Sequence, residues 1–418
     1  METEQQEEHA AIMQNNPATP ASLSALEKMP AEIILMVGAE VSPSDFMVAT
    51  LVSKRLRSVL LHRRFKNLTF SGSLKKLAHD MRSFLSGEFK NLMMTILSTL
   101  KSVTIRFEPY SRAEKSTDLH LSTYRIVVIG EFVSKLSSID LISFNNQIKD
   151  DIDFTEAFRS TPKWNGPKAV IFCGRRNFLI FSALINQFAP NTVKAVQLPR
   201  QTASRHPLAL KSAFPLLKGL MVDVSSLKSR SRTLACMSSN ILQRMNEYFP
   251  HLEALILYQV DIVACLSGSL RICKGLHLLN LNEYVERLIT QLKSMPRLRR
   301  FAFTIEEESL RLEYDCHLFD RLASSSGGDE SGDPMQATPE LNQWPYWLPT
   351  YAQKDLWWSE LITRILKAVP QLKELCIVHS PLEYHQGTKT EGIVTVREEE
   401  IACSDNSSQF PYILVDID

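Results

Sequence analysis

The chain has almost no net charge and no long apolar run. Its 47 Lys and Arg residues nearly balance its 46 Asp and Glu residues, which leaves a formal net charge of +1. Because nucleic acids and anionic lipids attract proteins with an excess of positive charge, the overall composition favours neither as a partner. The most apolar stretches, residues 33–37 and 126–129, are far shorter than the roughly 20 residues that span a bilayer. We therefore expect no membrane partner.

The first fifteen residues are acidic and polar, whereas a secretory signal begins with basic residues and continues with an apolar run. The sequence therefore predicts an intracellular protein, cytoplasmic or nuclear. The seven cysteines are scattered, and none has a second Cys within the two to four residues that structural zinc sites use. We interpret them as reduced core residues and predict no metal site.

Signatures of the common enzyme classes are also missing. The sequence contains no Gly-Lys-Ser/Thr phosphate loop, no Gly-x-Gly-x-x-Gly turn, no Gly-x-Ser-x-Gly elbow and no His-Glu-x-x-His helix. The prediction is therefore a protein without catalytic residues and without a cofactor. An enzyme with an unfamiliar active site stays open as an alternative.

A short motif recurs in the second half of the chain. In each copy a Pro is followed by Leu two positions later and by apolar residues at positions five and seven. Pro ends the preceding helix because it lacks a backbone N–H, and apolar residues two apart have the periodicity of a strand. Each copy therefore predicts a helix, a turn and a short strand. The four copies begin at Pro215, Pro250, Pro296 and Pro370.

Weaker copies predict further strands, and helical runs such as 124–136 and 178–188 precede several of them. A strand plus a helix every ~20 to 30 residues resembles leucine-rich repeats over roughly residues 95–380. The predicted fold class is α/β, a leucine-rich-repeat-like solenoid of helix-strand units. A doubly wound α/β domain shares the same local pattern and remains the alternative. The weaker strands are expected near Val103, Ile139, Val170, Val196 and Leu278.

Residues 29–59 contain three segments with helix signals. Met29-Pro30 followed by Glu32 opens the first, and apolar residues continue at helical spacing. Ser42-Pro43-Ser44-Asp45 opens the second with a capping hydroxyl, a Pro at the first helical position and a carboxylate three residues after the cap. Ser53-Lys54-Arg55 opens the third.

In these positions the segment resembles an F-box, a small three-helix domain. Two residues depart from the family pattern, Gly38 where a large aliphatic residue is usual and Leu56 where Trp is common. F-box segments bind the adaptor subunit of an SCF ubiquitin ligase. The resemblance therefore implies a non-catalytic substrate receptor whose partners are that adaptor, a cullin bound through it, and an unknown protein substrate.

The apolar residues of the segment, with one lysine, are the adaptor-binding candidates that the resemblance implies. Some of them must instead form the segment's own core, and the sequence does not sort the two groups. The alternative function is a repeat scaffold or regulator that acts outside ubiquitin ligation. The candidates are Pro30, Ile33, Ile34, Val37, Val41, Pro43, Phe46, Leu51, Val52, Lys54 and Leu56.

Four of the five tryptophans lie within residues 344–358. Trp and Tyr concentrate binding energy at interfaces, so this cluster is the candidate for substrate contact. Alternatively, these rings cap the C-terminal end of the repeats. The candidates are Trp344, Tyr346, Trp347, Trp357 and Trp358. The predicted organisation is a disordered tail (1–22), an F-box (23–70), a repeat domain (71–380) with a mobile loop at 324–343, and a less regular tail (381–418).

Overall fold

The computed structural model describes twelve stretches of the chain, and the chain divides into two units. The first, the helical unit, is Met1–Lys66 with Met94–Thr99, and the second, the sheet unit, is Asn67–Met93 with Leu100–Asp418. The described residues are 28–42 with 45 and 48, 53–64, 66–86, 96–109, 119–148, 154–174, 177–199, 205–224, 239–258, 281–304, 351–378 and 383–400.

The longest described helices of the helical unit are α1 (Ala31–Glu40) and α3 (Lys54–Arg64). Ser53 caps α3, since its Oγ accepts hydrogen bonds from the N–H groups of Arg55 at 3.2 Å and Leu56 at 3.4 Å. The Arg55 guanidinium then donates to the carbonyl of Met29 at 2.9 Å, which ties the start of α3 to the start of α1. The sequence prediction that Ser53 precedes a helix is confirmed.

Two further features of this unit follow from the sequence. Ser42 Oγ accepts the N–H of Asp45 at 3.2 Å and donates to its carboxylate at 2.8 Å, which is the predicted variant of a capping box. Helix α1 continues through Gly38, which is buried. The absence of a side chain at Gly38 therefore does not end the helix, although Gly inside a helix costs about 1 kcal/mol relative to Ala.

The sheet unit alternates strands and helices along the chain. Its strands are β1 (Asn67–Gly72), β2 (Ser102–Phe107), β3 (Leu141–Asn146), β4 (Ala169–Gly174), β5 (Ala195–Gln197), β6 (Gly219–Asp223), β7 (Ala254–Tyr258), β8 (Arg300–Thr304), β9 (Glu374–Val378), β10 (Glu383–Thr390) and β11 (Ile393–Glu400). Its described helices are α4 (Leu74–Leu85), α6 (Leu119–Ser134), α7 (Phe154–Phe158), α8 (Phe178–Ile185), α9 (Arg205–Ala213), α10 (Ser239–Tyr248), α12 (Leu281–Lys293) and α15 (Tyr351–Ala368).

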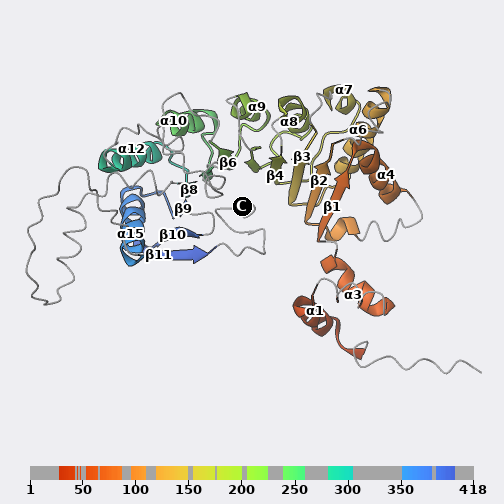
Figure 1. Ribbon diagram of the computed structural model, residues 1–418, viewed down its shortest axis with the longest axis horizontal. Helices are drawn as coiled ribbons and strands as arrows, with labels where there is room; N and C mark the ends of the chain where they lie inside the picture. The colour runs from red at the N-terminus through yellow and green to blue at the C-terminus, as the bar shows by residue number, and fades with distance from the viewer. Residues whose placement is uncertain are drawn as a thin grey trace, which may run out of the picture. The chain divides into compact units, whose positions relative to one another are not determined.

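All eleven strands form one sheet in which strand order equals chain order. Neighbours from β1 to β9 are parallel, whereas β10 and β11 add an antiparallel hairpin to β9. Each described helix from α4 to α15 contacts the next, so the helices form one layer beside the sheet (Figure 1). A doubly wound fold reverses its strand order and covers both faces. Among the described elements neither occurs, so the doubly wound alternative is wrong and the prediction of a mixed α/β fold is confirmed.

The Pro motif forms the turn that leads into each strand. In all four copies the N–H of the motif Leu donates to the carbonyl of the residue before Pro, at 3.1 to 3.2 Å. Pro is thus the second residue of a β-turn, where its fixed φ is favourable. The Leu side chain points into the core, with at most 2% of its surface exposed in every copy. The four residues are Leu217, Leu252, Leu298 and Leu372.

The two apolar strand positions of the motif stack in register across β6 to β9. Leu220 pairs with Leu255, Leu255 with Phe301 and Phe301 with Leu375. These side chains are fully buried and lie on the face of the sheet that the helices cover. On the same face, the rings of Phe70 and Phe84, from β1 and α4, lie 5.8 Å apart. We call this the core face and the opposite side the open face.

The weaker sequence signals also mark strands. Val103, Val170 and Val196 lie in β2, β4 and β5 as predicted, while Ile139 lies two residues before β3. Leu278 and the predicted mobile loop lie outside the described residues. The predicted helical runs 124–136 and 178–188 coincide with α6 and α8 within a few residues.

Two regions differ from the sequence prediction. Strand β1 occupies residues 67–72, so the sheet unit begins inside the range predicted as F-box. The hairpin of β10 and β11 lies where a less regular tail was predicted. Neither region contains the Pro motif. The hairpin signal was instead the turn at Glu391-Gly392, whose φ values of 52° and 84° suit a two-residue turn of this kind.

A pair of adjacent leucines tests the role of the motif. Leu217 is fully buried, whereas Leu216 is 50% exposed. We expect Leu217→Ala to lower the free energy of unfolding by about 2 to 5 kcal/mol, since a core methyl cluster is replaced by a cavity. Leu216→Ala should change it by less than about 0.5 kcal/mol. Urea denaturation followed by circular dichroism measures both, and equal losses would contradict this account of the motif.

Candidate functional site

Helix α1 of the helical unit places large apolar side chains in solvent. Met36 is 67% exposed, Val37 45% and Ile33 41%, and these three positions share one helix face by their spacing. A neighbouring face of the helix is anchored by Ile34, which is 2% exposed and packs with Leu56 and Leu60 of α3. An apolar face of this kind on a ten-residue helix is typical of a surface that binds another protein.

The structure sorts the adaptor-binding candidates that the sequence left unsorted. Ile34 and Leu56 form the core of the helical unit, and Val41 is half-buried against it, so these three are not free to dock. Leu56, which replaces an aromatic residue of the family pattern, is 3% exposed. The candidates that remain exposed are Pro30, Ile33, Val37 and Lys54. The candidates outside the described residues are Pro43, Phe46, Leu51 and Val52.

The tryptophans of α15 are buried, which corrects their assignment as substrate contacts. Trp357 is 6% exposed and Trp358 2% exposed, and their rings meet edge to face with centroids 4.3 Å apart. Both pack in the core beside the last strands, as the alternative of an end cap expects. Clustering in the sequence could not reveal this, because the helix phase decides which side chains turn inward. Trp344, Tyr346 and Trp347 lie outside the described residues.

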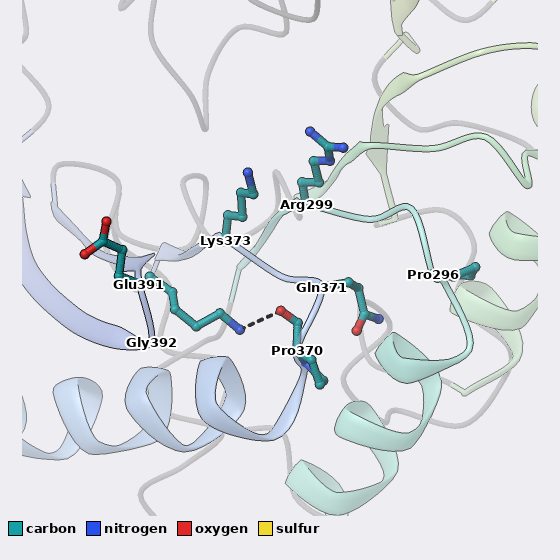
Figure 2. Close-up of a pocket in the computed structure, with 8 residues that line it drawn as sticks. Pro296, Arg299, Pro370, Gln371, Lys373, Glu391 and Gly392 are labelled. Atoms are coloured by element: carbon teal, nitrogen blue, oxygen red, sulfur yellow. Dashed lines mark hydrogen bonds between the residues drawn. The ribbon is translucent and has the colours of Figure 1, made fainter.

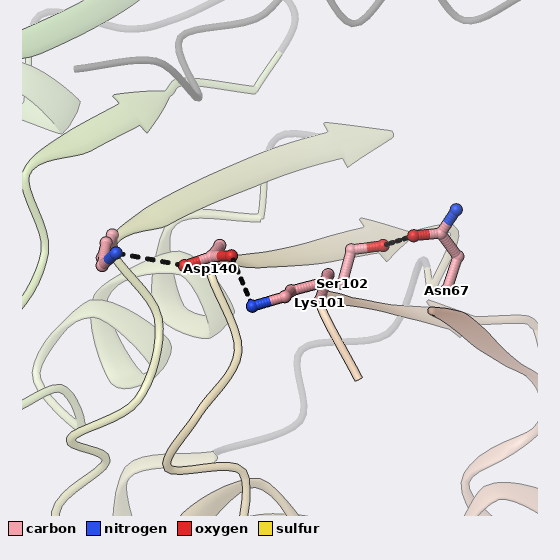
Figure 3. A network of polar contacts seen from close by, with 5 residues as sticks. Asn67, Lys101, Ser102 and Asp140 are labelled. Carbon is pink, nitrogen blue, oxygen red and sulfur yellow. Dashed lines mark hydrogen bonds and ion pairs between the residues drawn. The ribbon is translucent and has the colours of Figure 1, made fainter. Parts of the chain in front are cut away.

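The open face of the sheet has two different halves. Over β1 to β3 it is mainly polar and at least partly exposed, with residues such as Thr69, Thr104 and Asn145, and Ser102 donates to Asn67 Oδ1 at 2.8 Å (Figure 3). From β4 to β10 a buried cluster lies on this face. Among the described residues, the polar part of the face is therefore the part open to a partner. The buried cluster comprises Ala169, Ala195, Met221, Ala254, Ile256, Ala302, Cys376 and Tyr384.

Burial changes the acid-base behaviour of two groups in this cluster. Burial, with a smaller contribution from Glu374, raises the pKa of the Cys376 thiol well above its usual range. Since the thiolate is the reactive form, Cys376 is an inert core residue, as the sequence predicted. Burial, followed by the negative charge of Glu399, raises the pKa of Tyr384 to about 12.

A row of charged residues lines the edge at which the parallel strands begin. The residue directly before each strand from β2 to β9 is charged, and the sequence analysis missed this pattern. The signal was present, since the third position after Pro in each clear copy of the motif is Lys, Glu or Arg. We call these eight residues the edge row: Lys101, Asp140, Lys168, Lys194, Lys218, Glu253, Arg299 and Lys373.

One group of described residues has donor atoms suited to a metal ion. The donor atoms of Asp355, His385 and Glu398 lie within 4.8 Å of one another. His385 and Glu398 are direct partners across β10 and β11, and His385 Nε2 lies 2.8 Å from the Asp355 carboxylate of α15. His385 is only 2% exposed. The contact with Asp355 accounts for Nε2 of this buried ring and joins α15 to the hairpin.

Comparison with protein-family models finds no match to this chain, and comparison with curated proteins finds none either. Within the described residues, none of the helices combines the length and apolar character that crossing a bilayer requires. The site must therefore be interpreted from its own geometry. Among the described residues, that geometry gives three candidate surfaces: the exposed face of α1, the polar part of the open face and the edge row.

The raised pKa of Tyr384 gives the sheet unit a defined alkaline response. Between pH 10 and about 12 the unfolded chain loses this phenolic proton while the folded chain keeps it. The unfolded state then binds fewer protons, so the free energy of unfolding falls as pH rises through this range. We expect Tyr384→Phe to have a shallower fall. Urea midpoints measured across this pH range test the difference, and identical slopes in both proteins would contradict it.

Proposed function

We propose that the chain is the substrate-receptor subunit of an SCF-type ubiquitin ligase. In this proposal residues 29–59 are an F-box that docks on the adaptor, and the sheet unit is a leucine-rich-repeat-like solenoid that holds a protein substrate. The chain itself carries out no bond chemistry. The observation that carries the proposal is the exposed apolar face of α1, at Ile33, Met36 and Val37, in a segment that resembles an F-box.

Helix α1 has one buried and one exposed apolar face, and this arrangement supports docking by the exposed face. Ile34 faces α3 and supplies the core, and the Arg55 contact to the Met29 carbonyl holds the start of the helix. Ile33, Met36 and Val37 are left without a described apolar covering. Burying a large apolar side chain contributes about 1.5 to 3 kcal/mol, so three such residues are sufficient anchors for a specific interface.

The topology of the sheet unit supports the solenoid part of the proposal. Each helix-strand unit pairs with the next, strand order follows chain order, and the helices form a single layer. Stacked repeats of this kind contact their neighbours and leave one sheet face for partners. Here that face is the polar part of the open face, over β1 to β3. In the proposal it replaces the tryptophans of α15 as the substrate contact, because those tryptophans are buried.

The competing function is a repeat scaffold or regulator that never meets a ubiquitin ligase. Both functions use the sheet unit to bind a protein, so the sheet does not separate them. They differ in the helical unit, because a scaffold has no need for an exposed apolar helix face that matches one partner. Binding of the purified SCF adaptor therefore decides between them.

Substitution of Met36 provides that test. Met36→Glu places a carboxylate in the proposed interface, yet 67% of this side chain is exposed and Glu is a good helix former. We expect the full-length variant to bind the purified adaptor about 10- to 100-fold more weakly in calorimetry, with unchanged thermal stability. The matched control is Leu208→Glu, at a 53% exposed position on α9.

Three results would count against the proposal. They are undetectable binding by the wild-type chain, unchanged affinity in Met36→Glu, and an equal loss in Leu208→Glu. A deletion is less informative because the helical unit also includes Met94–Thr99. Any deletion must end at Lys66, since removal of residues up to 70 would cut into β1.

A further inference from the structure

We propose that Arg299 and Lys373 form a binding site for the carboxylate groups of an acidic protein segment, and that the edge row extends this contact along the sheet. The inference rests on the proposed function and deepens it, because it names the chemistry of the substrate. Its first support is the backbone geometry of the edge. The carbonyl of Arg299 accepts the N–H groups of Lys373 at 2.8 Å and Glu374 at 3.0 Å.

The same arrangement repeats along the whole edge row. From Lys101 to Lys373, the carbonyl of each row residue accepts the N–H of the next row residue and of the residue after it, at 2.7 to 3.1 Å. Because adjacent strands lie about 4.8 Å apart, the row holds its charges at a regular spacing. Six of the eight residues are basic and two are acidic. The row therefore carries a net charge of +4, from 6 − 2, although the whole chain carries +1.

Two carboxylates of the chain itself show how the cations of the edge row bind a carboxylate. The Asp140 carboxylate pairs with Lys101 at 3.6 Å (Figure 3) and with Lys168 at 3.2 Å. Glu253 pairs with Lys218 at 3.2 Å. Wherever the chain supplies an acid on this edge, a cation of a neighbouring strand pairs with it.

At Arg299 and Lys373 no described acid forms an ion pair, because Glu253, the row neighbour of Arg299, pairs with Lys218 instead. Two cations stand on adjacent strands with no ion-pair partner among the described residues, and like charges at this spacing repel. Figure 2 shows the two side chains pointing in the same direction, with Glu391 on the far side of Lys373 from Arg299. A carboxylate from a partner would relieve this repulsion as Asp140 does between its two lysines.

A pocket of about 360 Å³ adjoins these two cations. A third cation, Lys389, also lines the pocket. It is not available to bind an anion, because its Nζ donates to the carbonyls of Leu366, Val369 and Pro370 at 2.8 to 2.9 Å. Burial lowers the pKa of this lysine, and its role is to complete the C-terminal end of α15. Arg299 and Lys373 are both exposed and remain as the two anion-binding groups of the pocket.

The acids within the row favour a protein segment over a nucleic acid. A polynucleotide carries a phosphate at every residue, and those phosphates would approach Asp140 and Glu253 as well as the cations. A polypeptide can place Glu or Asp side chains opposite the cations and neutral residues opposite the two acids. The row, about 34 Å long from seven intervals of about 4.8 Å, is also a single line that suits an extended peptide.

The test uses the full-length chain and a fluorescein-labelled peptide of alternating Glu and Ser residues, with binding followed by fluorescence anisotropy. We expect measurable binding that weakens as salt is added. The double variant Arg299→Glu, Lys373→Glu should weaken binding about tenfold or more, because two charge-assisted contacts become repulsive. Arg299→Gln with Lys373→Gln should give a smaller loss, and circular dichroism should show both proteins folded, since only the backbone of these residues joins the sheet.

The matched control is Lys75→Glu with Arg244→Glu, two exposed cations on α4 and α10 that change the net charge equally. We expect its affinity for the peptide to stay within about twofold of the wild type. An equal loss in the control would show that binding follows net charge alone and overturn the proposal. Absence of wild-type binding, or a clear preference for a single-stranded oligonucleotide over the Glu peptide, would overturn it as well.

The outcome is separable from that of the proposed function, because adaptor binding is measured with the same proteins. If the wild-type chain binds the Glu peptide but not the adaptor, the carboxylate site is supported and the role in a ubiquitin ligase is contradicted. If it binds the adaptor but not the Glu peptide, the role is supported and the site is contradicted. The edge-row variants should bind the adaptor with wild-type affinity.

Discussion

Each strand from β3 to β9 begins level with the strand before it, because the carbonyl of the residue preceding one strand accepts two N–H groups at the start of the next. This paired contact repeats from Lys101 to Lys373 and fixes the register of the parallel strands. The register in turn aligns equivalent residues of successive repeats. Apolar residues such as Leu255 and Phe301 meet as direct partners on the core face, and the turn leucines fill the space between sheet and helices. A shift of one residue would turn these side chains to the open face.

The residues that make this contact do so with their backbone, so the contact itself does not depend on the identity of their side chains. That independence explains how all eight positions of the edge row can be charged without loss of the fold. It also explains why the charges differ between repeats, with Asp140 and Glu253 among six cations. The edge is therefore a place where binding chemistry can change while the core remains constant. Charge on this edge is also invisible in the net charge of the chain, since acids elsewhere cancel it.

The sequence was informative wherever one residue type acts locally. Pro ends a helix and favours a turn whatever surrounds it, so the strands after Pro215, Pro250, Pro296 and Pro370 were predicted correctly. It was uninformative wherever the outcome depends on a distant neighbour. Ile33 and Ile34 are identical and adjacent, yet the position of α3 buries only the second. The tryptophans of α15 look like interface residues until the helix is placed on the last strands.

The candidate site was likewise predictable where the signal is local and unpredictable where it depends on packing. The exposed face of α1 could be proposed from the sequence as a set of apolar residues, but its limits needed the packing of α1 against α3. The charged third position after Pro is visible in the sequence, but the sequence does not show which cations of the edge row form ion pairs. Lys168 and Arg299 each follow an acid in the edge row, but Asp140 pairs with Lys168 whereas Glu253 pairs with Lys218 and not with Arg299. Two equivalent positions in a repeat therefore differ in function because the neighbouring acids pair with different cations, and a single repeat cannot reveal that difference.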